Sequence, residues 1–411
     1  MKKKILIITD YRSGGAGHVA KISGDILNMH KYDVQYLFGI DFFKFNLKNY
    51  LFNISGFNIV SRKIESYNPD IVMLHNFDNL WSPLILKAIR KYKKTNSNIK
   101  VLMTLHDYHI ISATNSLTYY EGDQLNYFDK VPSLFELLKK RIDRRGRIYG
   151  YARILQWYIY YSILNLNSTI DTFICPSKFI MNKCVQRYKG GNVKVIYNPT
   201  KFVNTNNIKK VGKSLKILFA GRISKEKGIL EFLKLVISSS VEMKRKIHFD
   251  IIGEGDLLDE LKELKELKEL KELKELKELK ELKELKELTE GTRSNIQIHG
   301  RKSHDFVESK LITSNFVLLP STVFENAPLS LVEGTFKGCN LITMNYGGMK
   351  EIGEQLTSSI FLDELTQPSV DKVLKALDDF EDSSEYKKQR DMLAGKYGVE
   401  EYIKLIKNEL N

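Results

Sequence analysis

The chain has 411 residues, of which 43% are hydrophobic, so it can form two domains with sizeable cores and is not a disordered chain. Its net charge of +14 fits nucleic acid, an anionic membrane, an anionic substrate or simply a soluble basic surface, so charge alone selects none of these. Three scattered cysteines without CxxC spacing argue against a disulfide framework or a zinc site and favour a reducing compartment.

The first apolar run follows three lysines and has the outline of a signal peptide. It covers only Ile5–Ile8 before Thr9 and Asp10, which is too short for a signal-peptide core, so we interpret it as a β-strand. No run of about 18 apolar residues occurs, so no transmembrane helix is expected.

Short apolar segments alternate with helical patterns along the chain, which is typical of doubly wound α/β domains. Five segments of the first half are expected to be buried parallel strands: Lys4–Thr9, Val34–Phe38, Ile71–His75, Lys100–Leu105 and Thr172–Cys175. Five more follow a polar stretch: Lys216–Ala220, His248–Ile252, Ile296–His299, Phe316–Leu319 and Leu341–Met344. The pattern predicts two Rossmann-like domains, 1–199 and 215–385, joined by a linker at 200–214. A helical segment at 386–411 could cross back to the first domain.

The second domain contains a tandem repeat, because residues 261–287 are nine copies of Leu-Lys-Glu. All three residue types favour helix, and a leucine every third residue turns about 300° per step, so the leucines spiral instead of forming a coiled-coil stripe. We interpret the repeat as a solvated helical extension, with docking of a partner or a sister chain as the alternative. A straight helix over 257–288 would be about 48 Å long and its return segment spans at most about 24 Å, so a hairpin, fraying or an outward tilt is expected.

A glycine-rich segment follows the first predicted strand. The run from Gly15 to Ala20 matches the dinucleotide fingerprint G-x-G-x-x-A, but six residues separate it from the strand, whereas the fingerprint follows its strand directly. We therefore prefer a loop with Gly14 and Gly15 that closes over a ligand, followed by a helix N-terminus that favours an anion, over a nicotinamide or flavin site. A purely structural turn is the alternative.

Two histidines end consecutive predicted strands of the first domain. His106 closes one of these strands and His75 the strand before it, at the sheet edge where α/β domains bind ligands. A neutral His106 could hydrogen-bond a sugar hydroxyl, and a protonated one could face a phosphate. A core histidine with satisfied hydrogen bonds is the alternative.

Two cations flank the turn after the first strand of the second domain. Arg222 and Lys227 lie between Gly221 and Gly228, and their guanidinium and ammonium groups are of the kind that binds phosphate. A charged surface loop is the alternative.

Two carboxylates lie eight positions apart after a later strand. At this spacing Glu325 and Glu333 could lie near one helix face, and Pro328 suits the first helical turn. Three intervening amides would then lie near a helix N-terminus, which stabilises anions: those of Ala327, Leu329 and Ser330. Local helix capping is the alternative. One α/β domain would then carry cations that suit a diphosphate and carboxylates that suit sugar hydroxyls. This combination favours a nucleotide-sugar as ligand.

Residues 136–166 of the first domain combine basic and aromatic side chains. Seven cations alternate with six aromatics: Lys139, Lys140, Arg141, Arg144, Arg145, Arg147 and Arg153 with Tyr149, Tyr151, Trp157, Tyr158, Tyr160 and Tyr161. This composition favours contact with an anionic membrane, and an ordinary helix with core aromatics is the alternative. Nucleic acid is not expected, because no recognised binding motif accompanies the segment.

In combination these motifs resemble glycosyltransferase family 4, the retaining glycosyltransferases of GT-B fold. The matching segments run in order along nearly the whole chain: 14–16, 104–108, 175–177, 195–199, 221–228, 253–255, 320–333 and 347–351. The Arg…Lys turn and the two-glutamate segment are the specific part. The Leu-Lys-Glu repeat has no counterpart in the family pattern, and the cysteines that some relatives carry around an acceptor loop are missing from 110–129.

The resemblance implies a role for each motif. Arg222 and Lys227 would hold the diphosphate, Glu325 the donor-sugar hydroxyls and Glu333 the ribose. His106 would lie beside the transferred sugar. The remaining donor contacts would come from the loop of Gly14 and Gly15, from Gly253 and Arg301 near the base, and from the segment of Ala327, Leu329 and Ser330.

The resemblance further implies a metal-independent, retaining hexosyltransferase that uses a UDP- or GDP-sugar and no cofactor. It would act on a glycan or a lipid-linked acceptor in cell-surface polysaccharide synthesis. We expect a cytoplasmic protein, peripheral on the inner membrane face through 136–166, with self-association through the repeat and no nucleic-acid partner. A nucleotide-sugar epimerase of GT-B shape, or a degenerate transferase acting as an interaction module, are the alternatives.

Overall fold

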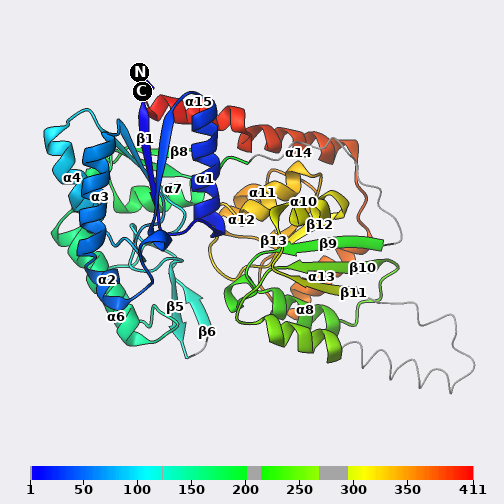
Figure 1. Ribbon diagram of the computed structural model, residues 1–411. Coiled ribbons are helices and arrows are strands. Elements are labelled where there is room, and N and C mark those ends of the chain that lie inside the picture. Colours follow the sequence, from blue (N-terminus) through cyan, green and yellow to red (C-terminus); the bar gives the residue numbers. More distant parts are fainter. Residues whose placement is uncertain (1, 123, 201–213, 268–294, 411) are drawn as a thin grey trace, which may run out of the picture. The chain divides into compact units, whose positions relative to one another are not determined.

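The computed structural model describes residues 2–122, 124–200, 214–267 and 295–410 (Figure 1). The chain divides into two units, Met1–Lys201 with Tyr397–Asn411, and Phe202–Lys396. Each unit is built on a six-stranded sheet in which all neighbouring strands are parallel. The prediction of two doubly wound α/β domains is therefore confirmed.

The sheet of the first unit has the strand order β2-β1-β3-β4-β7-β8. Its strands are β1 (Lys4–Thr9), β2 (Asp33–Phe38), β3 (Ile71–Leu74), β4 (Lys100–Thr104), β7 (Thr172–Cys175) and β8 (Val193–Val195). The longer helices of the unit are α1 (Gly14–Met29), α3 (Ile54–Tyr67), α4 (Ile85–Thr95), α6 (Arg147–Trp157) and α7 (Lys178–Arg187). Central strands such as β3 are buried throughout, as expected when helices cover both faces of a parallel sheet. The strand order reverses between β1 and β3.

Several short elements of the first unit were not predicted from the sequence. They are the edge strand β8, the hairpin of β5 (Thr118–Glu121) and β6 (Gln124–Tyr127), and the helices α2 (Leu47–Leu51), α5 (Leu134–Lys139) and the π-helix η2 (Tyr158–Ile163). Their sequences mix polar and apolar residues over three to six positions, so they carry no periodic signal.

The sheet of the second unit has the order β11-β10-β9-β12-β13-β14, the arrangement of a dinucleotide-binding fold, and reverses between β9 and β12. Its strands are β9 (Ser214–Ala220), β10 (Lys246–Ile252), β11 (Asn295–Gly300), β12 (Phe316–Leu319), β13 (Asn340–Met344) and β14 (Ile360–Leu362). Its helices include α8 (Ile229–Ser238), α10 (His304–Thr313), α11 (Leu329–Phe336), α12 (Gly347–Gly353) and α13 (Gln367–Asp378). Of the six strands described in this unit, the short strand β14 is the one that was not predicted.

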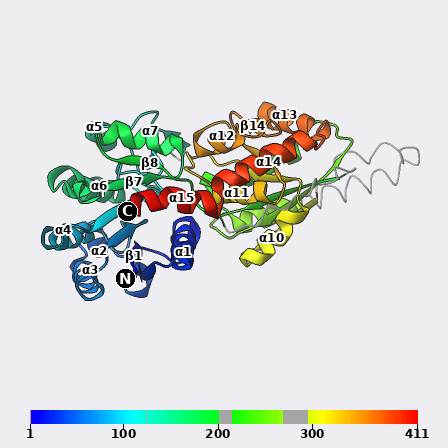
Figure 2. The same ribbon diagram turned by 90° about the horizontal axis from the view of Figure 1, so that it is seen from above.

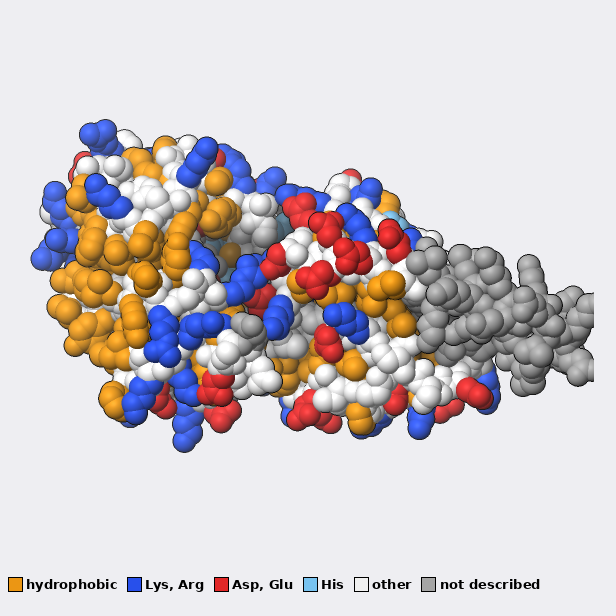
Figure 3. All heavy atoms as spheres, turned by 90° about the horizontal axis from the view of Figure 1, so that it is seen from below, with side chains coloured by type: hydrophobic (Ala, Val, Ile, Leu, Met, Phe, Trp, Pro, Cys, Tyr) orange, Lys and Arg blue, Asp and Glu red, His pale blue; other side chains and the backbone are white. Residues whose placement is uncertain are grey.

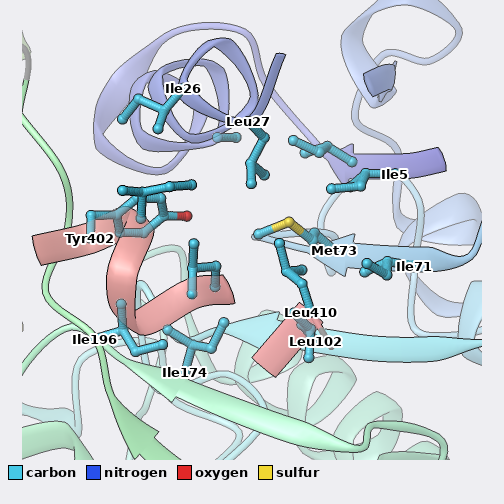
Figure 4. Close-up of a cluster of buried hydrophobic side chains, with 14 of the residues drawn as sticks. Ile5, Ile26, Leu27, Ile71, Met73, Leu102, Ile174, Ile196, Tyr402 and Leu410 are labelled. Atoms are coloured by element: carbon cyan, nitrogen blue, oxygen red, sulfur yellow. The ribbon is translucent and has the colours of Figure 1, made fainter. Parts of the chain in front are cut away.

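The C-terminal segment is shared between the two units. Helix α14 (Ser384–Tyr397) belongs mainly to the second unit, where Arg390 pairs with Asp382 and donates to the side chain of Asn340. Helix α15 (Val399–Leu410) belongs to the first unit and lies beside α1 (Figure 2). Its apolar face completes the core of the first unit (Figure 4), with four buried side chains: Tyr402, Ile403, Ile406 and Leu410.

The described start of the Leu-Lys-Glu repeat is helical at residues 258–267. Leu261 is fully buried, Leu264 is half-buried and Leu267 is 64% exposed, so these three leucines turn progressively away from the domain. The rest of the repeat, and with it the expected hairpin or outward tilt, lies outside the described residues. Within the described residues, no helix has the length and apolar character that crossing a bilayer requires.

Candidate functional site

The two main motifs of the second unit meet where its strand order reverses. The loop after β9 contains Arg222 and Lys227, and the loop after β12 leads to Glu325. The backbone amide of Thr322 donates to the carbonyl of Glu226 (2.8 Å), so the two loops are joined directly. Gly228, at φ +68°, lies so close to the second loop that a Cβ would be 2.1 Å from the carbonyl oxygen of Pro320. The ends of parallel strands at such a reversal form the usual ligand crevice of this fold.

Lys227 and Glu325 form an ion pair at this point. The Lys227 Nζ lies 2.5 Å from Glu325 Oε1, and the Ser321 hydroxyl donates to the same oxygen at 2.7 Å. Burial raises the pKa of Glu325, but the charge and hydrogen bond of Lys227, the hydroxyl of Ser321 and the charge of Arg222 outweigh it, so the net pKa is lowered. An ionised carboxylate and two cations therefore share this edge of the sheet.

A third loop holds the backbone of Glu325 from the other side. The amide of Gly348, near the start of α12, donates to the carbonyl of Glu325 at 2.7 Å. A Cβ at Gly348 would lie 1.7 Å from the carbonyl oxygen of Asn326, so only glycine allows this approach. The Gly347-Gly348 motif thus positions Glu325.

Helix α11 begins at Leu329, with Pro328 in extended conformation at its N-cap. Proline offers no capping side chain, so the first amides of the helix, including those of Leu329 and Ser330, are available to another acceptor. Glu325 and Ala327 precede the helix. Glu325 therefore lies in the loop before the helix that carries Glu333, because the chain becomes helical only after Pro328.

Glu333 lies on the buried side of α11, where its side chain is 7% exposed. Burial, together with the nearby charge of Glu308, raises the pKa of Glu333 to about 8. Glu308 itself pairs with Lys337 at 2.5 Å. With this pKa, the Glu333 side chain changes between its protonated and its ionised form as the pH varies around neutrality.

We expect the Glu333→Gln variant to lose part of the pH dependence of stability. Since the pKa of Glu333 is raised from 4.5 to about 8, the folded chain keeps a proton that the unfolded chain has lost. This stabilisation is complete below about pH 4.5 and disappears as the pH rises through 8. Thermal unfolding between pH 5 and 8 should show a steeper fall in Tm for the wild type than for Glu333→Gln. Glu381→Gln, at an exposed position, should follow the wild type, and parallel Tm profiles for all three would contradict the assignment.

The segments expected near the base also pack against the Arg222 loop. The amide of Ile223 donates to the carbonyl of Glu254 at 3.0 Å, and a Cβ at Gly253 would lie 1.8 Å from the carbonyl oxygen of Gly221. The Arg301 guanidinium donates to the Glu254 carboxylate at 3.0 Å, with both side chains exposed. The ends of β9, β10 and β11 therefore bring three of the predicted donor-binding regions together within the second unit.

In the first unit, the glycine-rich segment differs from the flexible loop expected. Gly14, at φ +79°, and Gly15 form the first turn of α1, and the Ser13 side chain makes no capping bond. A Cβ at Gly15 would meet no described atom within 4 Å, whereas one at Gly17 would lie 2.3 Å from the carbonyl oxygen of Tyr11. The tight glycine is thus Gly17, and Gly14 and Gly15 present an exposed helix N-terminus, the feature that favours an anion.

The two histidines of the first unit contact each other. His75 Nδ1 lies 2.7 Å from His106 Nε2, and the rings stack with centroids 5.0 Å apart. Burial lowers the pKa of His106 to about 4, the charge of His109 adds to the decrease, and Asp107 opposes it. Burial also lowers the pKa of His75. Both rings are therefore neutral near pH 7, which suits a hydrogen bond to a hydroxyl better than an ion pair with phosphate.

Beside these histidines lies a buried charged network that was not predicted from the sequence. The Asp10 carboxylate, at the end of β1, accepts the amides of Leu80 (2.9 Å) and Trp81 (3.1 Å), and burial with the charge of Asp78 raises its pKa to about 7. His109 Nδ1 lies 2.5 Å from Asp107 Oδ1. Burial disfavours its charged form, but Asp78 and Asp107 raise the pKa of His109 to about 9. The sequence does contain a signal for this network, because Asp and His residues recur just after three neighbouring strands.

Asp78, Asp107 and His109 offer one potential metal-ligand atom each, all within 4.8 Å of one another. His109 Nδ1 already faces both carboxylates, at 2.5 Å from Asp107 and 3.8 Å from Asp78. These distances fit a protonated imidazole between two carboxylates, so we describe the group as an ion-pair network.

Residues 201–394 match the family model of the glycosyl transferases group 1. The described part of this range forms the parallel sheet and the loops with Arg222, Lys227 and Glu325. The second unit is therefore a domain of this family, which confirms the resemblance to glycosyltransferases at this level. A search of curated protein sequences finds no match to the chain.

Solved structures with the same architecture extend over the whole chain. HepE of Anabaena, in complex with UDP and glucose, has a TM-score of 0.57 and 16% identity, covering 99% of both chains. The lipopolysaccharide outer core galactosyltransferase WaaB has a TM-score of 0.57 and 14% identity, again covering 99% of both chains. Sucrose-phosphate synthase of Thermosynechococcus elongatus has a TM-score of 0.66 and 11% identity, covering 99% of this chain and 98% of that chain. At these identities the likeness establishes the fold, and the chain has the GT-B fold.

Proposed function

We propose that the protein is a retaining glycosyltransferase that moves a hexose from a nucleoside diphosphate sugar to a glycan or a lipid-linked acceptor. The carrying observation is the Lys227–Glu325 ion pair, with Arg222 close enough to influence Glu325, at the strand reversal of a glycosyl transferases group 1 domain. Cations there suit a diphosphate, and the carboxylate suits sugar hydroxyls. The complex of the similarly folded HepE with UDP and glucose supports UDP as the nucleotide.

In the proposed reaction, the bond between the anomeric carbon and the diphosphate oxygen breaks and negative charge develops on the diphosphate. Arg222, Lys227 and the first amides of α11 would stabilise this charge without a metal, and Lys227 is held in place before the reaction by its bond to Glu325. The acceptor oxygen would bond to the anomeric carbon from the face that the diphosphate leaves, which retains configuration, and its proton would pass to the diphosphate. His106, neutral at pH 7, would hydrogen-bond a sugar hydroxyl.

The remaining assignments complete the proposed donor site. Glu333 would bind the ribose, and the segments of Gly253 and Arg301 would lie near the base. The exposed N-terminus of α1, at Gly14 and Gly15, would contact phosphate. A role in cell-surface polysaccharide synthesis on the cytoplasmic side of a membrane is part of this proposal.

A screen of nucleotide-sugars tests the proposal directly. UDP-glucose, UDP-galactose, UDP-N-acetylglucosamine and GDP-mannose would be incubated with the full chain, with release of the nucleoside diphosphate as readout. We expect slow hydrolysis of one donor, with NMR showing the α-anomer of the sugar first. An inverted sugar would contradict retention, and a new nucleotide-sugar without hydrolysis would identify an epimerase. Failure of UDP and GDP to bind in calorimetry would favour an interaction module.

A further inference from the structure

The first unit exposes an apolar stripe along α6 and the π-helix that follows it. Ile148, Tyr151, Leu155 and Tyr158 recur at intervals of three and four residues, which places them on one helix face. All four are exposed, Ile148 by 76% and Leu155 by 48%. The π-helix continues the stripe, because its i→i+5 bonding places the exposed Ile163 about one turn beyond Tyr158.

The opposite face of the same helices forms part of the core. Trp157, Tyr160 and Tyr161 are at most 6% exposed, and the Tyr160 hydroxyl donates to the carbonyl of Leu51 at 2.7 Å. Three of the aromatics that favoured a membrane surface in the sequence are therefore core residues. The surface keeps Tyr151 and Tyr158 of the predicted aromatics and is otherwise formed by side chains outside that set.

A second segment, about a hundred residues earlier, lies beside this stripe and enlarges it. Helix α2 contacts α6, the Gln156 side chain donates to the carbonyl of Tyr50, and the rings of Phe52 and Tyr160 are 6.2 Å apart. This segment adds exposed Phe45, Phe52 and Ile54. Figure 3 shows a broad apolar area on the first unit, on the side where α2 and α6 lie in Figure 1, with Lys and Arg side chains along its border.

All charged side chains of both segments are cationic. Residues 42–64 and 144–170 contain no Asp or Glu, while Lys44, Lys48 and Arg147 lie among the exposed apolar positions. Asp143, just before the second segment, is buried and already paired with Arg145 and Arg153. Exposed apolar side chains among cations, in segments without acidic residues, match an anionic bilayer. The headgroups of such a bilayer attract the cations, and its acyl boundary accepts the apolar groups. A second copy of this face would instead bring like charges together.

We infer that this α2–α6 surface, defined by Phe45, Phe52, Ile54, Ile148, Leu155 and Ile163, docks the protein on an anionic lipid bilayer. The size of the apolar area supports this, because monomeric soluble proteins rarely expose such continuous patches without a partner. Cations alone would give weak, salt-sensitive adsorption, and the apolar groups supply an attachment that salt does not screen. This inference does not depend on the proposed transfer reaction, since lipid binding and donor hydrolysis are measured separately.

Vesicle co-sedimentation of the full chain tests the docking surface. We expect binding to vesicles of 30% phosphatidylglycerol in phosphatidylcholine, and much weaker binding to pure phosphatidylcholine. The Ile148→Asp/Leu155→Asp double variant should bind the anionic vesicles at least about tenfold less, because two exposed apolar side chains become anions at the bilayer. Met29→Asp is the matched control, since Met29 is 77% exposed on α1, and it should bind like the wild type.

Several outcomes would overturn the inference. One is an absence of binding by the wild type to anionic vesicles, and another is equal binding of wild type and double variant. A dimer of the wild type in sedimentation equilibrium that the double variant dissociates would identify a second copy as the occupant instead. Near-ultraviolet circular dichroism matching the wild type would show that the double variant keeps its fold, so that lost binding reports on the surface.

Discussion

Lys227→Ala is expected to lower kcat for sugar transfer by about 10²- to 10³-fold, the usual cost of removing one preorganised group that stabilises developing negative charge. The Lys227 ammonium is held 2.5 Å from Glu325 Oε1, and Glu325 is in turn fixed by the Ser321 hydroxyl at 2.7 Å. A cation held in this way needs no rearrangement as charge forms on the diphosphate. Initial rates of transfer, or of donor hydrolysis where the acceptor is unknown, measure the effect. Lys225→Ala, at an exposed position of the same turn, should keep a rate close to wild type.

The same substitution leaves Glu325 without its closest cation, so folding and catalysis must be separated. The Glu325 side chain is only 16% exposed, and losing one partner of such a pair can cost about 3 kcal/mol of stability. The Lys227→Met/Glu325→Gln double variant removes the unpaired charge as well. We expect it to regain much of the Tm lost by Lys227→Ala and to remain inactive. Transfer at the wild-type rate by folded Lys227→Ala would refute the role of Lys227.

Gly348→Ala is expected to destabilise the second unit by about 1–3 kcal/mol, the typical cost of overpacking, and to weaken binding of the nucleoside diphosphate at least tenfold. The new Cβ would lie 1.7 Å from the carbonyl oxygen of Asn326 and 2.9 Å from that of Glu325. These are backbone atoms, so no side chain can rotate away and the Glu325 loop itself has to move. Thermal unfolding and calorimetric titration with UDP measure the two effects.

Gly395→Ala provides the matched control for this clash. Gly395 is also a helical glycine of the second unit, but a Cβ there would meet no described atom within 4 Å. This variant should gain about 0.5–1 kcal/mol, because alanine favours helix over glycine. If Gly348→Ala bound UDP as tightly as Gly395→Ala, the Gly347-Gly348 loop would not be positioning Glu325.

The strands were predicted most accurately where they are buried on both sides. The predicted bounds of β1, β7 and β12 agree with the structure residue for residue. A strand covered on both faces is a continuous apolar run, which is visible without knowledge of its neighbours. The edge strands β8 and β14 have three residues each, and they exist only through pairing with β7 and β13. No local pattern could reveal them.

The candidate site was predictable as a set of residue types at strand ends but not as a set of contacts. Arg222, Lys227 and Glu325 were expected at one sheet edge because parallel strands end there together. The direct pairing of Lys227 with Glu325 depends on the loop join between Glu226 and Thr322. The placement of Glu333 on a helix that begins only after Pro328 depends equally on local backbone geometry.

Periodicity thus predicted two parallel α/β units and the groups at the carboxyl ends of their strands, because burial on both faces of a sheet leaves its pattern in the chain itself. Packing in three dimensions decided which side chains of these units meet. Trp157, Tyr160 and Tyr161 became core because α2 and neighbouring loops cover them, while Ile148 and Leu155 on α6 stayed exposed. The reason is physical: a sequence pattern marks a face as apolar, but only the other elements of the fold determine whether that face is covered.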